Sequence, residues 1–129
     1  DVLRWFDEKR TMVVVEEAGR VSAFASAFTY RPRRCYDGVR EFSVYVSRDA
    51  RGKGLGRIAL KALFAAARSR GDWKLLSRVF LFNTGSRKLC AACGFREVGI
   101  YEKHAQLDGK WLDVVIIEHL IPANQPEQM

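Results

Sequence analysis

Several stretches of this chain have apolar and polar patterns that predict β-strands. Residues 11–16 are β-branched, residues 21–30 are rich in small and aromatic residues, and residues 40–47 alternate between apolar and polar positions, as a strand with one buried face does. The stretches are residues 11–16, 21–30, 40–47, 96–106 and 110–120. Turn sequences at residues 18–20 and 107–109 join the first two and the last two stretches into predicted hairpins. A nearly continuous apolar run at residues 75–82 predicts one more strand, buried in the middle of a sheet.

Helical spacing replaces alternation in two other segments. Between Leu55 and about Arg70, apolar residues recur every three or four positions, and Gly71 follows as a stop signal. A short helix is predicted to follow the capping residues 83–86 and to run to Cys93. At the two ends, residues 1–10 are predicted to be the end of an amphipathic helix, and the polar residues 122–129 a frayed tail.

Length and composition fit one compact domain over residues 1–129, because 48% of the 129 residues are hydrophobic. No apolar run approaches the roughly 20 residues that span a bilayer, and the first residues do not resemble a signal peptide. Three cysteines form no disulfide pattern, so we expect free thiols and a cytoplasmic location. The net charge of +7 favours an anionic partner, which would be nucleic acid, a membrane surface or a small molecule.

A glycine-rich basic loop, residues 51–57, joins the strand at 40–47 to the longer helix. Glycines let the backbone aim several N–H groups at one point, and the positive end of the helix dipole points there too, so the junction predicts a phosphate site. A Walker loop would need Lys-Ser/Thr after its last glycine, where Arg57-Ile58 stands. A Rossmann loop would lie near the start of a βαβ unit and not after several antiparallel strands.

The loop Arg51-x-x-Gly54-x-Gly56 matches the pyrophosphate loop of the GNAT acetyltransferases at every defined position. Asn83-x-x-Ser86-x-x-Leu89-x4-Gly94-Phe95 resembles the second GNAT signature. Two further segments, around Glu41 to Val46 and Gly109 to Val114, resemble the phosphinothricin N-acetyltransferase family within that superfamily. The chain is thus identified as similar to this family over nearly all of its length.

The resemblance implies a GNAT fold of the α/β (α+β) class, with a central, mixed, mostly antiparallel sheet and flanking helices. It implies transfer of an acetyl group from acetyl-CoA to the amino group of a small molecule, an amino acid or a phosphinothricin-like analogue, with no metal. The family's first strand and the helix that lines its acceptor cleft precede the point matching Asp1, so we expect both to be missing here. Relatives associate, so a homodimer is expected; no nucleic-acid or membrane partner is expected.

Site residues follow from the same resemblance. Glu41 is the expected general base, Arg33 and Tyr36 are the expected substrate-binding residues, and Cys90 stands where the family has a side chain able to protonate the CoA thiolate. Water is the alternative donor for that proton. The expected cofactor-binding residues are Val44, Tyr45, Val46, Arg51, Gly52, Lys53, Gly54, Leu55, Gly56, Arg57, Asn83 and Ser86.

Other interpretations stay open at this point. A catalytically weak or inactive acyl-CoA-binding module is favoured by the short N-terminus and by Cys90. A nucleic-acid binder would use the basic loop at residues 31–34, but the chain carries no recognition motif. Cys90 and Cys93 lie toward the end of a helix and have no matching histidine spacing, so neither a redox nor a metal site is predicted.

Overall fold

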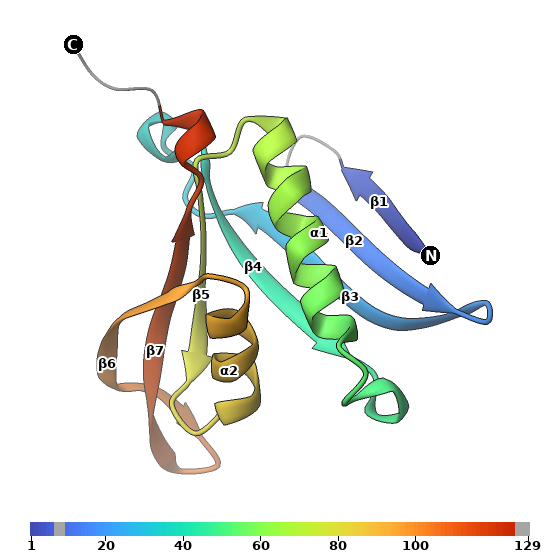
Figure 1. Ribbon diagram of the computed structural model, residues 1–129. Helices are drawn as coiled ribbons and strands as arrows, with labels where there is room; N and C mark the ends of the chain where they lie inside the picture. Colours follow the sequence, from blue (N-terminus) through green and yellow to red (C-terminus); the bar gives the residue numbers. More distant parts are fainter. Residues whose placement is uncertain (7–9, 126–129) are drawn as a thin grey trace.

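A single seven-stranded sheet with two helices forms the protein, and its computed structural model describes residues 1–6 and 10–125 (Figure 1). The strand order is β1-β2-β3-β4-β5-β7-β6. The strands are β1 (Val2–Phe6), β2 (Arg10–Glu17), β3 (Arg20–Thr29), β4 (Val39–Val46), β5 (Lys74–Phe80), β6 (Arg96–Leu107) and β7 (Lys110–Leu120). The helices are α1 (Leu55–Arg70) and α2 (Thr84–Ala92), with short 3-10 turns η1 (Arg34–Tyr36), η2 (Arg48–Ala50) and η3 (Pro122–Asn124).

Neighbouring strands are antiparallel except for β4 and β5, which are parallel. Their pairing is short, because it covers only residues 39–41 of β4 and 74–76 of β5. Beyond Glu41 the two strands separate, and Figure 1 shows them diverging toward the end from which α1 starts. The mixed, mostly antiparallel sheet expected from the sequence is therefore confirmed. Beyond their short parallel pairing, β4 and β5 diverge and leave a V-shaped opening between them.

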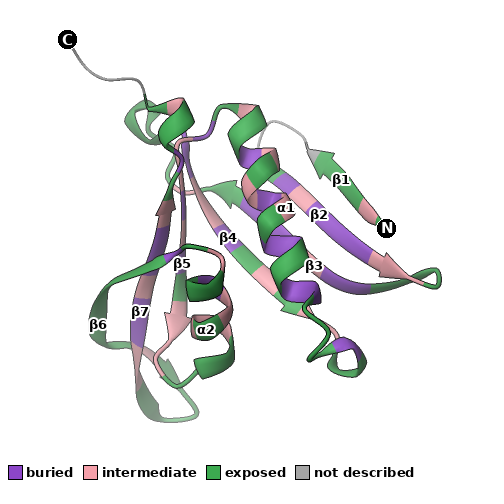
Figure 2. Cartoon of the chain, viewed as in Figure 1, coloured by how far each residue is buried: buried purple, intermediate pink, exposed green. Residues whose placement is uncertain are grey.

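The core lies between the sheet and α1, where buried residues concentrate (Figure 2). On β3 the residues under the helix are three fully buried alanines, which let the helix lie close to the strand; they are Ala23, Ala25 and Ala27. Leu60 and Leu63 fill the remaining space and are themselves fully buried. Burying a leucine contributes about 2 kcal/mol, so this contact fixes α1 and the loop before it.

Turn chemistry agrees with the sequence at both hairpins. Ala18 and Gly19 have positive φ angles of 51° and 79°, and Asp108 and Gly109 have 51° and 77°. Two consecutive positive φ angles define the type I′ turn, whose twist matches that of antiparallel strands. The predicted strands at residues 11–16, 21–30, 40–47, 75–82, 96–106 and 110–120 and the two predicted helices are confirmed to within a few residues.

Both chain ends differ from the prediction. Val2–Phe6 is not the end of a helix but strand β1, which pairs with the edge of β2; residues 7–9 lie outside the described part. A free sheet edge offers hydrogen-bond partners at every second residue, whereas one helical turn is costly to nucleate. The expected frayed tail is ordered through Gln125, because Asn124 donates to the carbonyls of Arg68 and Asp72; residues 126–129 lie outside the described part.

Candidate functional site

A groove of about 780 Å³ opens where β4 and β5 separate. Its walls are the second half of β4, the glycine-rich loop, the first turn of α1 and one side of α2. The lining residues are Val44, Tyr45, Val46, Ala50, Arg51, Gly52, Gly54, Leu55, Gly56, Arg57, Asn83, Gly85, Ser86, Lys88, Leu89 and Ala92. The structure thus brings eleven of the twelve expected cofactor-binding residues together around one groove.

Each glycine of the loop is required by a different structural constraint. Gly52 and Gly54 have φ angles of 84° and 76°, a region that other residues enter only at a cost of about 1–2 kcal/mol. Gly56 lies against two side chains, since a Cβ built there would come within 3.0 Å of both Val46 Cγ2 and Leu89 Cδ2. The first two glycines turn the chain into the helix, and the third lets the helix start between β4 and α2.

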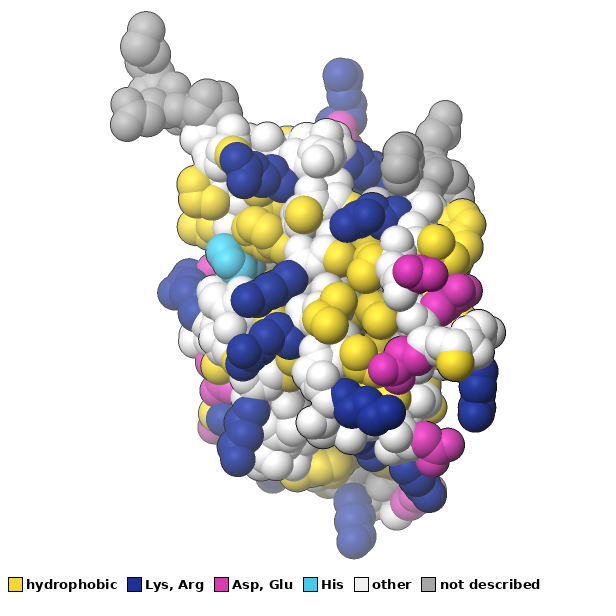
Figure 3. All heavy atoms as spheres, turned by 45° about the vertical axis from the view of Figure 1, so that its right-hand side comes forward, with side chains coloured by type: hydrophobic (Ala, Val, Ile, Leu, Met, Phe, Trp, Pro, Cys, Tyr) yellow, Lys and Arg dark blue, Asp and Glu magenta, His cyan; other side chains and the backbone are white. Residues whose placement is uncertain are grey.

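The first turn of α1 is open to an anion. Its first N–H groups have no partner within the helix, and among the described residues no side chain caps them and no acidic residue lies in that turn. Arg51, Arg57 and Lys88 line the same groove. Exposed basic residues continue along α1 at Lys61 and Arg68, and Figure 3 shows basic side chains spread over this face. Unpaired N–H groups, the helix dipole and the three cations that line the groove, Arg51, Arg57 and Lys88, favour a phosphate at the helix start.

Strand β4 presents backbone groups to the groove as well. The Ser47 N–H bonds to the Ser22 carbonyl on β3, and the Phe42 carbonyl accepts the Ser77 hydroxyl of β5 at 2.9 Å. Because the backbone groups of successive residues in a strand point to opposite edges, those of Val44 and Val46 point away from β3 into the gap. These two residues lie beyond the paired part of β4 and β5. An extended ligand can therefore hydrogen-bond to β4 as an added strand.

On the opposite wall, Asn83 caps α2 by accepting the Ser86 N–H at 3.1 Å. Gly85, Lys88, Leu89 and Ala92 were missed as lining residues. Their helical spacing after Asn83 was the signal that could have found them, since positions three and four apart share one helix face.

Lys53 is the expected cofactor residue that the groove does not include. Its Nζ lies 3.8 Å from Glu17 Oε1, and it lines a separate hollow beside that residue. The cause is the turn of the backbone at Gly52 and Gly54, which places the side chain between them away from the groove.

Glu41 is the last residue of β4 that pairs with β5, so it lies at the apex of the V-shaped opening. Its Oε2 accepts a hydrogen bond of 2.7 Å from Arg78 Nη2, a residue of β5. The Glu41 side chain is 14% exposed and the Arg78 side chain 40%. The pKa of Arg78 is raised, chiefly by this hydrogen bond. Arg78, 37 residues away in the sequence, is a partner of Glu41 that local sequence patterns did not reveal.

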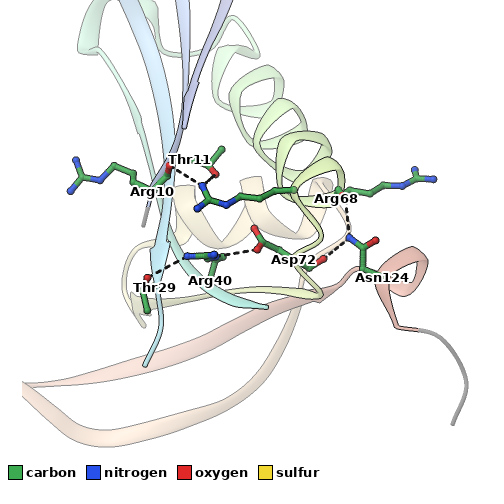
Figure 4. Close-up of polar contacts among 8 residues, drawn as sticks. Arg10, Thr11, Thr29, Arg40, Arg68, Asp72 and Asn124 are labelled. Carbon is green, nitrogen blue, oxygen red and sulfur yellow. Dashed lines mark hydrogen bonds and ion pairs between the residues drawn. The ribbon is translucent and has the colours of Figure 1, made fainter. Parts of the chain in front are cut away.

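The neighbouring residue Arg40 is tied to the end of α1 (Figure 4). Its Nε lies 3.1 Å from Asp72 Oδ1, and its Nη1 donates to Thr29 Oγ1. Burial raises the pKa of Asp72, while the hydrogen bond and charge of Arg40 oppose that rise. Asn124 donates to the backbone carbonyl of Asp72 from the other side. This network anchors the start of β4, and with it the position of Glu41.

The expected acceptor residues lie in the loop between β3 and β4. The Tyr36 ring makes an edge contact with that of Tyr30, with centroids 5.7 Å apart. Arg33 is exposed, and in the described part of the chain its side chain has no hydrogen bond or ion pair. Tyr36 therefore packs on Tyr30, which follows the end of β3, and Arg33 is free in solvent.

Cys90 does not reach the groove. The residue is 2% exposed and belongs to the core, and burial raises its pKa to about 12. Because the side chain is buried in the core and does not line the groove, it cannot donate a proton directly to a thiolate bound there. We therefore do not retain Cys90 as an acid.

The described residues contain neither a candidate metal site nor a candidate membrane-spanning helix. In residues 1–6 and 10–125, no group of three or more His, Cys, Asp or Glu side chains is placed to hold a metal ion. Neither α-helix in that part of the chain is long and apolar enough to cross a membrane.

Comparison with known proteins shows which family has this fold and sequence. The sequence model of the acetyltransferase (GNAT) family matches residues 1–95. The chain belongs to the GNAT acetyltransferase family. Its sequence is 37% identical over 113 residues to phosphinothricin N-acetyltransferase of Alcaligenes faecalis, covering 86% of this chain and 57% of the relative.

Two other relatives extend the comparison of this GNAT protein. An L-methionine sulfoximine/L-methionine sulfone acetyltransferase of Pseudomonas paraeruginosa is 34% identical, with 88% of this chain and 69% of the relative covered. The crystal structure of a GNAT superfamily phosphinothricin acetyltransferase from Sinorhizobium meliloti in complex with acetyl-CoA has a TM-score of 0.80 and 29% identity. That match covers 87% of this chain and 61% of the crystallised one, so the chain spans from 57% to 69% of the length of these three relatives.

Proposed function

We propose that this GNAT protein transfers the acetyl group of acetyl-CoA to the amino group of a small molecule, an amino acid or a phosphinothricin-like analogue. The observation that carries the proposal is the single groove, which combines an uncapped helix start, three cations and the free edge of β4. The relatives named as phosphinothricin and methionine sulfoximine acetyltransferases support the same substrate class. Acetyl-CoA is present in a solved relative of the same fold.

Acetyl-CoA would lie along the groove in two parts. Its pyrophosphate would accept hydrogen bonds from the N–H groups of the loop and the first turn of α1, with Arg51 and Arg57 beside it. Its pantetheine arm would pair with Val44 and Val46 between the separated strands. The thioester then comes to lie near the apex, where β4 and β5 meet at Glu41.

The chemistry asks for a neutral amine and a stabilised oxyanion. Glu41 would take the proton from the acceptor's ammonium group, directly or through one water molecule. The neutral amine would attack the thioester carbonyl, and a backbone N–H of Val44 or Val46 would hydrogen-bond to the oxyanion of the tetrahedral intermediate. The C–S bond then breaks, the positively charged nitrogen of the intermediate would release its remaining extra proton to water, and the departing thiolate would take up one proton from that water.

Replacement of the base tests this proposal. Glu41→Gln keeps the shape and a hydrogen-bonding group but removes the carboxylate, so kcat should fall about 100-fold or more. The dissociation constant for acetyl-CoA, measured by calorimetry, should stay within a factor of about two, because Glu41 does not line the groove. Glu97→Gln is the matched control, since Glu97 also pairs with an arginine but lies on β6. Equal turnover in Glu41→Gln and the parent protein would exclude Glu41 as the base.

A second candidate is an acyl-CoA-binding module with little or no catalysis. The position of Cys90 in the core favours it, because no cysteine side chain then serves the leaving thiolate. Release of free thiol from acetyl-CoA in the presence of amino acids distinguishes the two. Binding of acetyl-CoA without acceptor-dependent thiol release would favour the module.

We also propose a homodimer in a reducing, cytoplasmic setting. The edge strand β6 exposes Val98, Ile100 and Tyr101, which supports association through this strand. The three cysteines are all free, which supports the compartment. Light scattering coupled to gel filtration tests the first point, and a mass of one chain at micromolar concentration would contradict it.

A further inference from the structure

The ion pair between Glu41 and Arg78 bridges the apex of the V-shaped opening from its outer side. Glu41 and Leu76 are register partners on β4 and β5, and Arg78 is two residues further along β5, so both charged side chains point to one face of the sheet. Phe42, next to Glu41, points to the opposite face and is buried in the core beneath the helices. The pair therefore lies at the apex, next to the residues that line the groove but not among them, and is open to solvent on the other face of the sheet.

Arg78 has capacity for a second partner. Its guanidinium carries five N–H donors, and in the described part of the chain only the bond to Glu41 Oε2 uses one. The side chain is 40% exposed, so the remaining donors are accessible. Tyr30 and Tyr101 lie close enough to contribute to the raised pKa of Arg78, and the Tyr30 ring contacts the Tyr36 ring. An accessible cation is thus held beside the expected base and among aromatic rings.

An α-amino acid carries the complementary pair of charges at nearly the same spacing. Its ammonium and carboxylate groups are separated by a single carbon atom, and Glu41 and Arg78 present a carboxylate and a guanidinium in direct contact. An ammonium at Glu41 places the α-carboxylate within reach of the free edge of the guanidinium, which suits a carboxylate in bidentate fashion. The binding of both groups orients the amine toward the thioester.

Resting on the proposed function, we propose that Arg78 binds the α-carboxylate of the acceptor and makes the enzyme selective for free amino acids over amines that lack this group. Arg78 is then a specificity-determining residue that works together with Glu41. A purely structural link between β4 and β5 is the competing explanation. That link would give no reason for the enzyme to distinguish acceptors by their carboxylate.

The test compares each of the twenty L-amino acids, and phosphinothricin, with the corresponding α-carboxamide. The amide keeps the side chain and the amine but removes the negative charge, so its amine also loses its proton more easily. Without carboxylate binding, the amide would be the better acceptor. We expect kcat/KM to favour the free acid for the best acceptor, and we expect Arg78→Gln to reduce that ratio of acid to amide about 10- to 100-fold.

Three controls make the ratio decisive. Arg78→Lys keeps the positive charge but loses the two parallel N–H donors of the guanidinium, so it should retain part of the preference for the acid over the amide. Arg96→Gln removes another arginine from a carboxylate on the same sheet, that of Glu118, and should leave the ratio unchanged. A change in the basicity of Glu41 acts more strongly on the acid, whose amine is harder to deprotonate, and pH profiles of kcat/KM for both acceptors separate this effect from carboxylate binding. Melting temperatures and acetyl-CoA affinities of the variants check the fold and the groove.

The outcomes are separable. If the parent protein acetylates amides as well as acids, or if Arg78→Gln leaves the ratio unaltered, the inference is wrong while the acetyltransferase proposal stands. If the parent protein binds acetyl-CoA but acetylates neither class, the proposed function itself fails. A ratio that collapses in Arg78→Gln and partly recovers in Arg78→Lys supports carboxylate binding.

Discussion

Gly38 lies flat against the indole ring of Trp73. A Cβ built on Gly38 would come within 1.9 Å of Trp73 Cε3, and the Gly38 carbonyl accepts the Trp73 N–H at 2.7 Å. This contact joins the start of β4 to the start of β5, just below the paired residues that carry Glu41. The distance from β4 to β5 at the closed end of the V therefore depends on the absence of a side chain at position 38.

Gly38→Ala should destabilise the protein by about 1–3 kcal/mol or more, because the ring must move to admit a methyl group. Chemical denaturation monitored by tryptophan fluorescence measures the change. Gly99→Ala is the control, since a Cβ at position 99 meets no atom within 4 Å. Similar stability of the two variants would show that the indole ring moves without cost.

Gly54→Ala should weaken acetyl-CoA binding about tenfold. Alanine at a φ of 76° is strained by about 1–2 kcal/mol, and relief of that strain turns the loop N–H groups away from the groove. Gly19→Ala introduces the same strain at a φ of 79° in the β2–β3 turn, also with open space around it. Calorimetric titration of both variants separates the two effects; equal affinities for acetyl-CoA would mean that the loop conformation does not matter for binding.

Glu118 should make stability dependent on acidic pH. Its carboxylate is nearly buried and lies 2.8 Å from Lys74 Nζ and 2.6 Å from Arg96 Nη2. The pKa of Glu118 is lowered from 4.5, first by the hydrogen bond from Lys74 and then by that from Arg96, against the effect of burial. A lowered folded-state pKa means that the stabilisation is fully present above about pH 4.5 and is lost as the pH falls through the folded value.

Glu118→Gln should therefore cost about 1–3 kcal/mol at pH 7, and the difference from the parent protein should shrink as the pH falls below 4.5. Urea unfolding at pH 7 and at several values between 5 and 3 measures this difference. A difference that stays constant over this range would contradict the ionic origin. Glu97→Gln, which breaks an exposed pair with Arg87, should have a much smaller effect.

Thiol reactivity should follow burial in the order Cys35, Cys93, Cys90. Cys35 is exposed, Cys93 is half-buried with its pKa raised by burial, and the pKa of Cys90 is about 12. Mass spectrometry after brief alkylation at pH 8 should find Cys35 modified and Cys90 modified only after unfolding. Cys35→Ser should remove the fast reaction, and rapid labelling of Cys90 in the folded protein would contradict the buried position.

Local sequence signals were sufficient for most of the fold and most of the groove. The hairpin turns, the start of α1 and the loop glycines each depend on residues close together in the chain. The signals failed where the outcome depends on distant partners. Arg78 reaches Glu41 across 37 residues of sequence, and Val2–Phe6 became a strand because β2 offered an edge. The burial of Cys90 could not be predicted for the same reason, since its packing partners come from other elements.

The early separation of β4 from β5 has a mechanical consequence. The backbone pairing of residues 39–41 with 74–76 joins the two wings of the sheet, and the Ser77–Phe42 hydrogen bond, the Glu41–Arg78 ion pair and the contact between α1 and α2 add to it. A pantetheine chain bonded to Val44 would act as a wedge that locks these wings together. With acetyl-CoA bound, the two wings should move as one rigid body, and their amide hydrogens should exchange more slowly. Without it, the two wings should move independently of each other.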